Sequence, residues 1–190
     1  MKQKSEINSP IHTNLFKGKT MKKFSVISLL VLLVVLASVS VVFASSQHYE
    51  AHLTSTGEPF PVDSQAVGQA IFRVTNDGQA IEYRLIVANI EDARMAHIHY
   101  LPSGAATGPI SVWLYPETPQ PILIPGVFNG VLMSGTITQA DLDALIPATG
   151  ADTRPIKTMA ELLAAMEAGS TYVNVHTVVY GAGEIRGPIK

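Results

Sequence analysis

Residues 68–89 read GQAIFRVT-NDGQ-AIEYRLIVAN, and this stretch decides the fold class. Two runs in which apolar and polar side chains alternate flank the turn sequence Asn76-Asp77-Gly78. An Asp-Gly pair tolerates the positive φ that a tight turn requires, so the stretch predicts a β-hairpin. The apolar residues of the second run recur at every other position, namely Ile81, Tyr83, Leu85 and Val87. This spacing indicates a sheet with one buried face.

Further strands with turn residues between them are predicted on both sides of the hairpin. The candidates run from Gln47 to a break at Gly57, and over residues 95–100, 110–115, 127–137, 171–180 and 184–189. Two short helices are predicted after Thr138 and Thr158, because each threonine precedes an acidic residue by three positions, as in a capping box. This set of short strands indicates an all-β fold, which we expect to be a Greek-key-like antiparallel β-sandwich with two short helical insertions.

The beginning of the chain differs from the rest in charge. Up to Ala44 it holds six basic residues and one acidic residue, whereas the remainder holds seven basic and fourteen acidic residues. Lys22 and Lys23 precede an almost uncharged apolar run, residues 24–44, with Val42 and Ala44 at the −3 and −1 positions of a cleavage site. This pattern is typical of a secretory signal peptide. We therefore expect a leader over residues 1–44 and one folded domain over residues 45–190.

Two alternatives stay open for the leader. Met21 is an alternative start of the chain, because the residues before it are polar and have no periodic pattern. The apolar run of about 20 residues is also long enough to span a bilayer, so an uncleaved membrane anchor competes with a cleaved signal peptide. Both alternatives place the domain outside the cytoplasm. In the second, the protein contacts the membrane only through this N-terminal segment.

The composition excludes several classes of function. The sequence has no cysteine, which excludes disulfides, zinc–thiolate sites, iron–sulfur clusters and cysteine catalysis. Charged residues make up only 15% of the chain and the domain is acidic, which argues against disorder and against a nucleic-acid partner. The sequence shows no phosphate-binding loop, no serine-hydrolase elbow and no acid pair spaced for glycoside hydrolysis. No catalytic residue is therefore assigned.

Three histidines form the candidate site. His97 and His99 share one face of a predicted strand, together with Met95, because side chains alternate along a strand. His176 lies on a second predicted strand, on the face opposite to its aliphatic residues. If the two strands are neighbours, three imidazoles converge, and neutral imidazole is a ligand for copper or zinc. The competing interpretation is that these histidines are solvated or hydrogen-bonded side chains without a metal.

Other polar and aromatic residues have plainer interpretations. Glu184 and Arg186 lie on one face of the last predicted strand, either as a charged pair that guides or holds an anion, or as a structural ion pair worth about 0–1 kcal/mol if exposed. Trp113 is predicted to lie in the core. His48 and His52 are predicted to lie on the surface.

The order of several motifs gives the chain a family resemblance. After the hairpin come AHIH (96–99), GPISVWL (108–114), GTIT (135–138), ELLAAMEAG (161–169), YVNVHT (172–177) and GEIRG (183–187). This order resembles the CHRD domain, named for chordin, over residues 49–189. The family usually has a glycine shortly after the His-Ile-His motif, where this chain has Tyr100, Leu101 and Pro102.

The resemblance implies a location and a general role. CHRD domains occur in extracellular proteins, so it implies a secreted, non-enzymatic binding module of undefined ligand, whose partner is an extracellular protein or a cell-surface component. A fainter similarity is to Cu/Zn superoxide dismutase, also a Greek-key sandwich, in which a similar order of residues recurs; the matching positions are His97, His99, His176 and Arg186. It implies a similar site location, without the disulfide cysteines or a recognisable zinc loop.

Three functions follow from these observations. The first is the CHRD binding module, and the second is a histidine-based metal-binding domain that uses copper or zinc. The third is a structural protein of the cell envelope, anchored by an uncleaved segment over residues 24–44.

Overall fold

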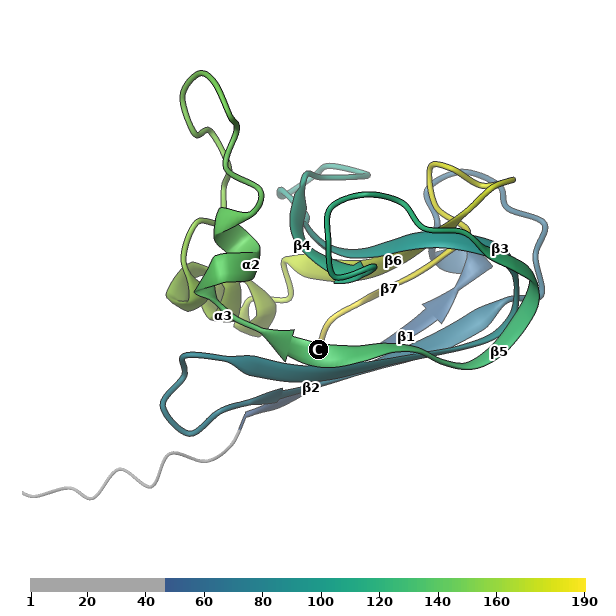
Figure 1. The fold of residues 1–190 in the computed structure, drawn as a ribbon, viewed down its shortest axis with the longest axis horizontal. Coiled ribbons are helices and arrows are strands. Elements are labelled where there is room, and N and C mark those ends of the chain that lie inside the picture. The colour runs from purple at the N-terminus through teal and green to yellow at the C-terminus, as the bar shows by residue number, and fades with distance from the viewer. Residues whose placement is uncertain (1–46) are drawn as a thin grey trace, which may run out of the picture. The chain divides into compact units, whose positions relative to one another are not determined.

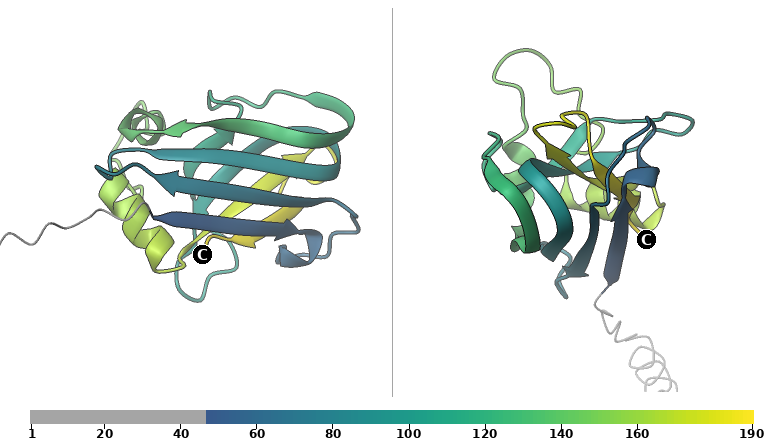
Figure 2. Two further views of the ribbon diagram at one scale, coloured as in Figure 1. Left: turned by 90° about the horizontal axis from the view of Figure 1, so that it is seen from below. Right: turned by 90° about the vertical axis from the view of Figure 1, so that its right-hand side faces the viewer.

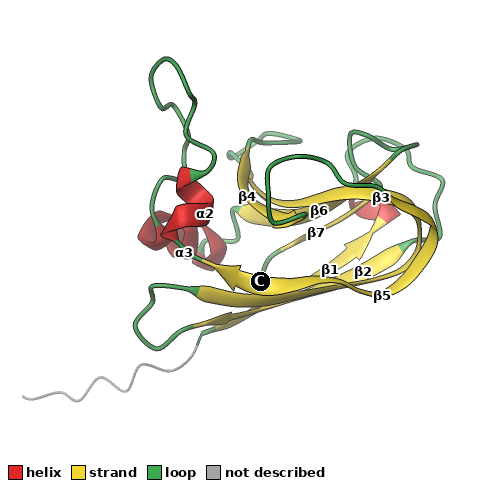
Figure 3. Cartoon of the chain, viewed as in Figure 1, coloured by secondary structure: helices red, strands yellow, loops and turns green. Residues whose placement is uncertain are grey.

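The computed structural model describes residues 47–190, so the predicted leader and its signal peptide lie outside the described residues. In these residues the strands are β1 (His48–Thr54), β2 (Val67–Val74), β3 (Ile81–Tyr100), β4 (Ile110–Tyr115), β5 (Ile124–Ile137), β6 (Thr171–Thr177) and β7 (Ile185–Pro188). The helices are a 3-10 turn, η1 (Ser55–Gly57), and two short α-helices, α2 (Gln139–Asp143) and α3 (Met159–Glu167). The described residues form mainly strands with short helical segments, which confirms the all-β prediction (Figure 3). All strand pairings are antiparallel.

The predicted hairpin is formed by β2 and β3. The two strands pair in register from Val74 opposite Ile81 to Val67 opposite Ala88. Gly78 adopts the positive φ, +68°, that the turn requires. The alternate apolar residues of β3 are buried as expected, because they face the core of the domain. A local pattern of alternation and one turn therefore fixed this part of the fold.

Strand β3 belongs to both layers of the fold and connects them. Its first part pairs with β2 and β5, and its last part, from Ala93 onward, pairs with β6 and β4. Asn89 and Asp92 have positive φ, and the pairing with β5 is irregular around them, so the strand bends between its two parts (Figure 1). We expected one strand to end at Asn89 and another to cover residues 95–100. This expectation is wrong, because Ile90 and Glu91 continue the ladder with β5 through the bulges.

The pairing of strands closes on itself. The path runs β2-β1-β7-β6-β3, and β3 pairs again with β2. One layer holds β1, β2, β5 and the first part of β3, and the other holds β4, β6, β7 and the last part of β3, as Figures 1 and 2 show from three directions. The core lies between the layers and includes Phe72, Leu85, Ile98, Leu114 and Ile185.

The outer face of β6 is covered rather than solvated. All seven residues of β6 are buried, although one face of the strand points away from the core. The strand ends at Thr177 instead of Tyr180, because the Thr177 hydroxyl accepts a hydrogen bond from the Tyr180 backbone in a turn. Loops cover the outer face of β6. The alternation of side chains in the sequence indicated only one buried face, so it underestimated the burial of this strand.

Both predicted helix starts are confirmed. The Asp141 carboxylate accepts a hydrogen bond from the backbone of Thr138, and Glu161 accepts one from the backbone of Thr158. Gly169, with φ +64°, follows α3 as a C-terminal glycine should. Among residues 47–190, no helix has both the length and the apolar character to cross a bilayer.

Candidate metal centre

The three candidate histidines come from two adjacent strands. Strands β3 and β6 pair so that Met95 lies opposite His176, His97 opposite Asn174, and His99 opposite Tyr172. Opposite residues of an antiparallel pair point to the same face of the sheet. Ala96 and Ile98 point into the core between the layers, so the histidines point to the outer face of this layer.

On this face the three imidazole rings converge. One ring nitrogen from each of His97, His99 and His176 lies within 4.8 Å of the other two. His97 Nδ1 and His176 Nε2 are 3.1 Å apart. Two nitrogens that share an ion at bond lengths of about 2.0–2.1 Å lie at most about 4 Å apart. The separation of His97 Nδ1 and His176 Nε2 lies within this limit, but a hydrogen bond now joins these two nitrogens, so metal binding requires a rearrangement of the rings.

The hydrogen bonds of the rings define their tautomers. His99 Nδ1 lies 2.8 Å from the carbonyl oxygen of Gly108, and His176 Nδ1 lies 3.1 Å from that of Gly181. A carbonyl only accepts, so both Nδ1 atoms carry the proton and both Nε2 atoms carry a lone pair. His97 Nδ1 must then donate to His176 Nε2. Metal-binding histidines usually donate their second ring N–H to a carbonyl in this way.

The cluster is closed to solvent. The exposed fraction is 1% for His97, 8% for His99 and 6% for His176. His97 Nε2 and His99 Nε2 are buried and have no hydrogen-bond partner. The histidines are therefore not solvated, because loops bury the face on which they lie, whereas their hydrogen bonds agree with the other half of the competing interpretation.

The electrostatic environment keeps the rings neutral. Burial, and then the neighbouring rings of His176 and His99, lower the pKa of His97 to about 2. Burial, and then His99, lower the pKa of His176 to about 4. Burial is also the main cause of the lowered pKa of His99, with a further contribution from the Arg186 guanidinium. At neutral pH the rings are thus in the form that binds a metal.

Aromatic rings hold two of the histidines in place. Tyr172 stacks on His99 with a centroid distance of 4.9 Å, and Arg186 lies 4.7 Å from the Tyr172 ring centroid. Trp113 packs edge-on against His97, with centroids 4.2 Å apart. The prediction that Trp113 lies in the core is wrong, because it pairs with His97 across β4 and β3 and is only partly buried on the outer face.

The structure separates Glu184 from Arg186. The salt bridges of residues 47–190 include none between these two side chains. Glu184 precedes β7 and accepts a hydrogen bond of 2.5 Å from the Ser64 hydroxyl. Arg186 donates to the carbonyl oxygens of Gly57 and Ala106. Arg186 therefore joins two segments over the site, and the two side chains do not form the ion pair that was one of their two interpretations. Their role with an anion stays a prediction.

Two polar residues of the site were not predicted. Asn174 is buried beside His176, and its Nδ2 donates to Glu58 Oε1 at 3.0 Å. Burial raises the pKa of Glu58 to about 7, against the opposing effects of Arg186 and Asn174. The sequence places Asn174 on the same strand face as His176, which was the available signal, whereas Glu58 arrives from a distant loop. His48 and His52 are exposed, as predicted.

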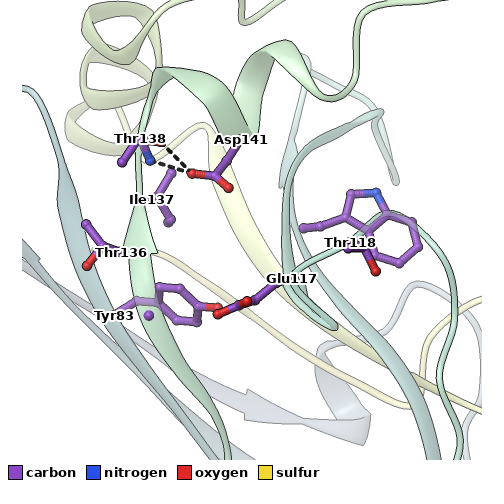
Figure 4. Close-up of a pocket in the computed structure, with 9 residues that line it drawn as sticks. Tyr83, Glu117, Thr118, Thr136, Ile137, Thr138 and Asp141 are labelled. Carbon is purple, nitrogen blue, oxygen red and sulfur yellow. Dashed lines mark hydrogen bonds between the residues drawn. The ribbon is translucent and has the colours of Figure 1, made fainter.

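A separate pocket of about 470 Å³ opens beside Trp113. Its lining includes Tyr83, Glu117 and Asp141, which Figure 4 shows with their neighbours. The Asp141 carboxylate is occupied in capping α2, and the Tyr83 hydroxyl donates to the Leu114 carbonyl. Trp113 lines this pocket and also contacts a ring of the histidine cluster.

Comparison with known proteins gives one match. The family model described as the CHRD domain matches residues 49–189, which is most of the chain. No curated protein and no solved structure matches the chain.

Proposed function

Because the chain belongs to the CHRD family, we propose that it is an extracytoplasmic binding module, and that its bound ligand is a copper or zinc ion held by His97, His99 and His176. Membership of the family supports a binding role and leaves the ligand undefined. The identity of the ligand is inferred from the chemistry of the site.

One observation carries this proposal, the convergence of three buried neutral imidazoles. Two of their nitrogens, His97 Nε2 and His99 Nε2, are acceptors without a donor. A buried polar atom left in this way costs about 1–3 kcal/mol. A cation bound by the lone pairs would remove the cost, and three imidazoles of this kind suit copper or zinc.

Contacts within the protein orient the histidine rings and set their tautomers without the help of an ion. The carbonyl groups of Gly108 and Gly181 fix the tautomers of His99 and His176, so both Nε2 atoms carry a lone pair without loss of a proton. Stacking on Tyr172 fixes the plane of the His99 ring. An ion at His176 Nε2 would take the lone pair that His97 Nδ1–H now uses, so metal binding must break the hydrogen bond between the two rings.

The location and the partner follow from other features. The signal-peptide pattern of residues 22–44 and the occurrence of CHRD domains in extracellular proteins both support a site of action outside the cytoplasm. We propose a non-enzymatic role with an extracellular protein or a cell-surface component as partner. Anchoring of the chain in the cell envelope stays a prediction.

The test is metal analysis of the full chain, expressed without a histidine tag. After dialysis against copper or zinc and removal of free ions, we expect about one ion per wild-type chain. The double variant His97→Ala/His99→Ala should bind none, whereas His52→Ala, which changes an exposed ring, should bind as the wild type does. Circular dichroism checks that both variants are folded. A stoichiometry near zero for the wild type, or equal stoichiometry in the folded double variant, contradicts the proposal.

A further inference from the structure

The charge of the site bears on which ion it selects. Among the described residues, the potential metal ligands gathered here are three histidines without a carboxylate. The nearby carboxylates have other partners, since Glu58 accepts from Asn174 and Glu184 accepts from Ser64. No anionic ligand would therefore neutralise a bound ion within its own coordination shell.

A nearby cation adds to this effect. Arg186 lies over Tyr172, which in turn stacks on His99, so the guanidinium places positive charge beside the site. The cost of moving an ion from water to a buried site rises with the square of its charge, so a divalent ion costs about four times as much as a monovalent one of the same size. The electrostatics of the site favour a monovalent ion.

A soft ligand lies at the edge of the cluster. Met95 is two residues before His97, on the same face of β3, and lies directly opposite His176 on β6. The Cβ atoms of such a pair are about 4.5–5.5 Å apart, so the flexible thioether is within reach of an ion at His176 Nε2. Thioether sulfur is a soft, neutral ligand that suits monovalent copper, whereas zinc in proteins is bound by thiolate, imidazole and carboxylate.

From these observations we propose that the site selects monovalent copper, and that Met95 supplies a thioether ligand beside His97, His99 and His176. This inference rests on the proposed metal-binding function and specifies its ion. Neutral nitrogen and sulfur donors satisfy monovalent copper without an anionic ligand. Copper bound here would be shielded from solvent by the loops that Arg186 joins.

The experiment compares metals and variants on the full chain. Metal-free protein is titrated under nitrogen with Cu(I) in competition with a chromophoric Cu(I) chelator, and separately with Zn(II) in competition with a zinc indicator. The variants are Met95→Leu, which removes the sulfur but keeps the size, and Met133→Leu as the matched control. Met133 lies on β5 and packs against the core, away from the histidines. X-ray absorption at the copper edge reports sulfur in the coordination shell.

We expect tighter binding of Cu(I) than of Zn(II), and weaker binding of Cu(I) by Met95→Leu by about tenfold or more, in the range that loss of a supporting metal contact produces. The Zn(II) affinity of Met95→Leu and both affinities of Met133→Leu should be unchanged. Copper bound to the wild type should show a sulfur neighbour that is lost in Met95→Leu.

Three other outcomes have distinct meanings. Equal Cu(I) affinity in Met95→Leu and the wild type, or copper without a sulfur neighbour, overturns the role of Met95. Tighter binding of Zn(II) than of Cu(I) overturns the selectivity but leaves the histidine metal site in place. Failure of the wild type to bind either ion overturns the proposed function itself, and this inference with it.

Discussion

His97 Nδ1 lies 3.1 Å from His176 Nε2, although 79 residues separate the two histidines in the chain. The contact joins the last part of β3 to β6 on the outer face of one layer, beneath the loops that cover it. It is a hydrogen bond, and it occupies a lone pair that an ion would need. The first prediction follows from this competition.

Metal binding should remove the hydrogen bond between His97 and His176. In nitrogen-edited NMR spectra of the metal-free protein, we expect a slowly exchanging Nδ1–H proton for each of the three rings. One ion should remove the signal of His97, because its acceptor becomes a ligand, and should keep those of His99 and His176, which donate to carbonyl groups. Persistence of all three signals in protein shown to contain one zinc ion would contradict this assignment.

The fluorescence of Trp113 should report on the site. Trp113 is the only tryptophan of the chain and lies 4.2 Å from His97, measured between ring centroids. We expect copper to quench its emission and the change to be complete at one ion per chain. The double variant His97→Ala/His99→Ala should show no saturable quenching. Equal quenching of this variant would show that copper acts from elsewhere.

Acid should destabilise the metal-free protein. The pKa values of His176 and His97 are lowered to about 4 and about 2, from an ordinary value of 6.5, so the unfolded chain binds more protons below pH 6.5. The free energy of unfolding should therefore be highest above pH 6.5 and should fall as the pH drops from there toward 4. Each of the two rings contributes a loss of up to about 2 kcal/mol at pH 5. Urea midpoints at pH 7.5, 6 and 5 measure the loss.

Glu58 acts in the opposite direction and provides the control. Its pKa is raised to about 7, so the folded state binds the extra proton and this group alone favours folding as the pH falls through 7. Two buried rings with lowered pKa values oppose this single carboxyl group, so the net effect of acid on the free energy of unfolding remains destabilising. Glu58→Gln removes the opposing contribution and should make the loss below pH 6.5 steeper. Urea midpoints that do not change between pH 7.5 and 5 in Glu58→Gln would show that the buried rings do not resist protonation.

The loop that orients His99 should tolerate no side chain at Gly108. A Cβ atom at this position would lie 1.7 Å from the carbonyl oxygen of Tyr100, so Gly108→Ala must displace backbone. We expect a loss of about 1–3 kcal/mol in the free energy of unfolding, as overpacking produces, and weaker metal binding because the His99 acceptor moves. Denaturant unfolding and metal competition measure the two effects.

Gly181→Ala is the matched control for this substitution. Its carbonyl orients His176 as that of Gly108 orients His99, but a Cβ atom at Gly181 has no heavy atom within 4 Å. Both stability and metal affinity should stay close to the wild-type values. If Gly108→Ala behaves like Gly181→Ala, the packing of the loop does not determine the orientation of His99.

Much of the fold could be predicted because it depends on short-range geometry. The alternation in residues 68–89 and the Asp-Gly turn predicted the β2–β3 hairpin, and Thr138 and Thr158 predicted the helix starts. The single bent strand β3 was missed, because a bulge with positive φ at Asn89 and Asp92 leaves no apolar periodicity to follow.

The candidate site was predictable in part, because the alternation of side chains along a strand is also short-range geometry. Alternation along a strand placed His97 and His99 on one face, and His176 on the polar face of its own strand. It could not show that loops bury that face, nor that Arg186 would contact the carbonyl groups of Gly57 and Ala106 instead of Glu184. Contacts of this kind depend on where loops distant in the chain come to rest.

The sequence alone therefore determined the strand and helix types, the turn between β2 and β3 and the face on which each histidine lies, because backbone dihedral angles and side-chain alternation act over a few residues. Only the tertiary structure decided that β3 and β6 are neighbours, that the rings of His97, His99 and His176 meet, and that loops exclude water from them. Strand pairing across 79 residues is selected by the packing of the whole core, which no local pattern contains.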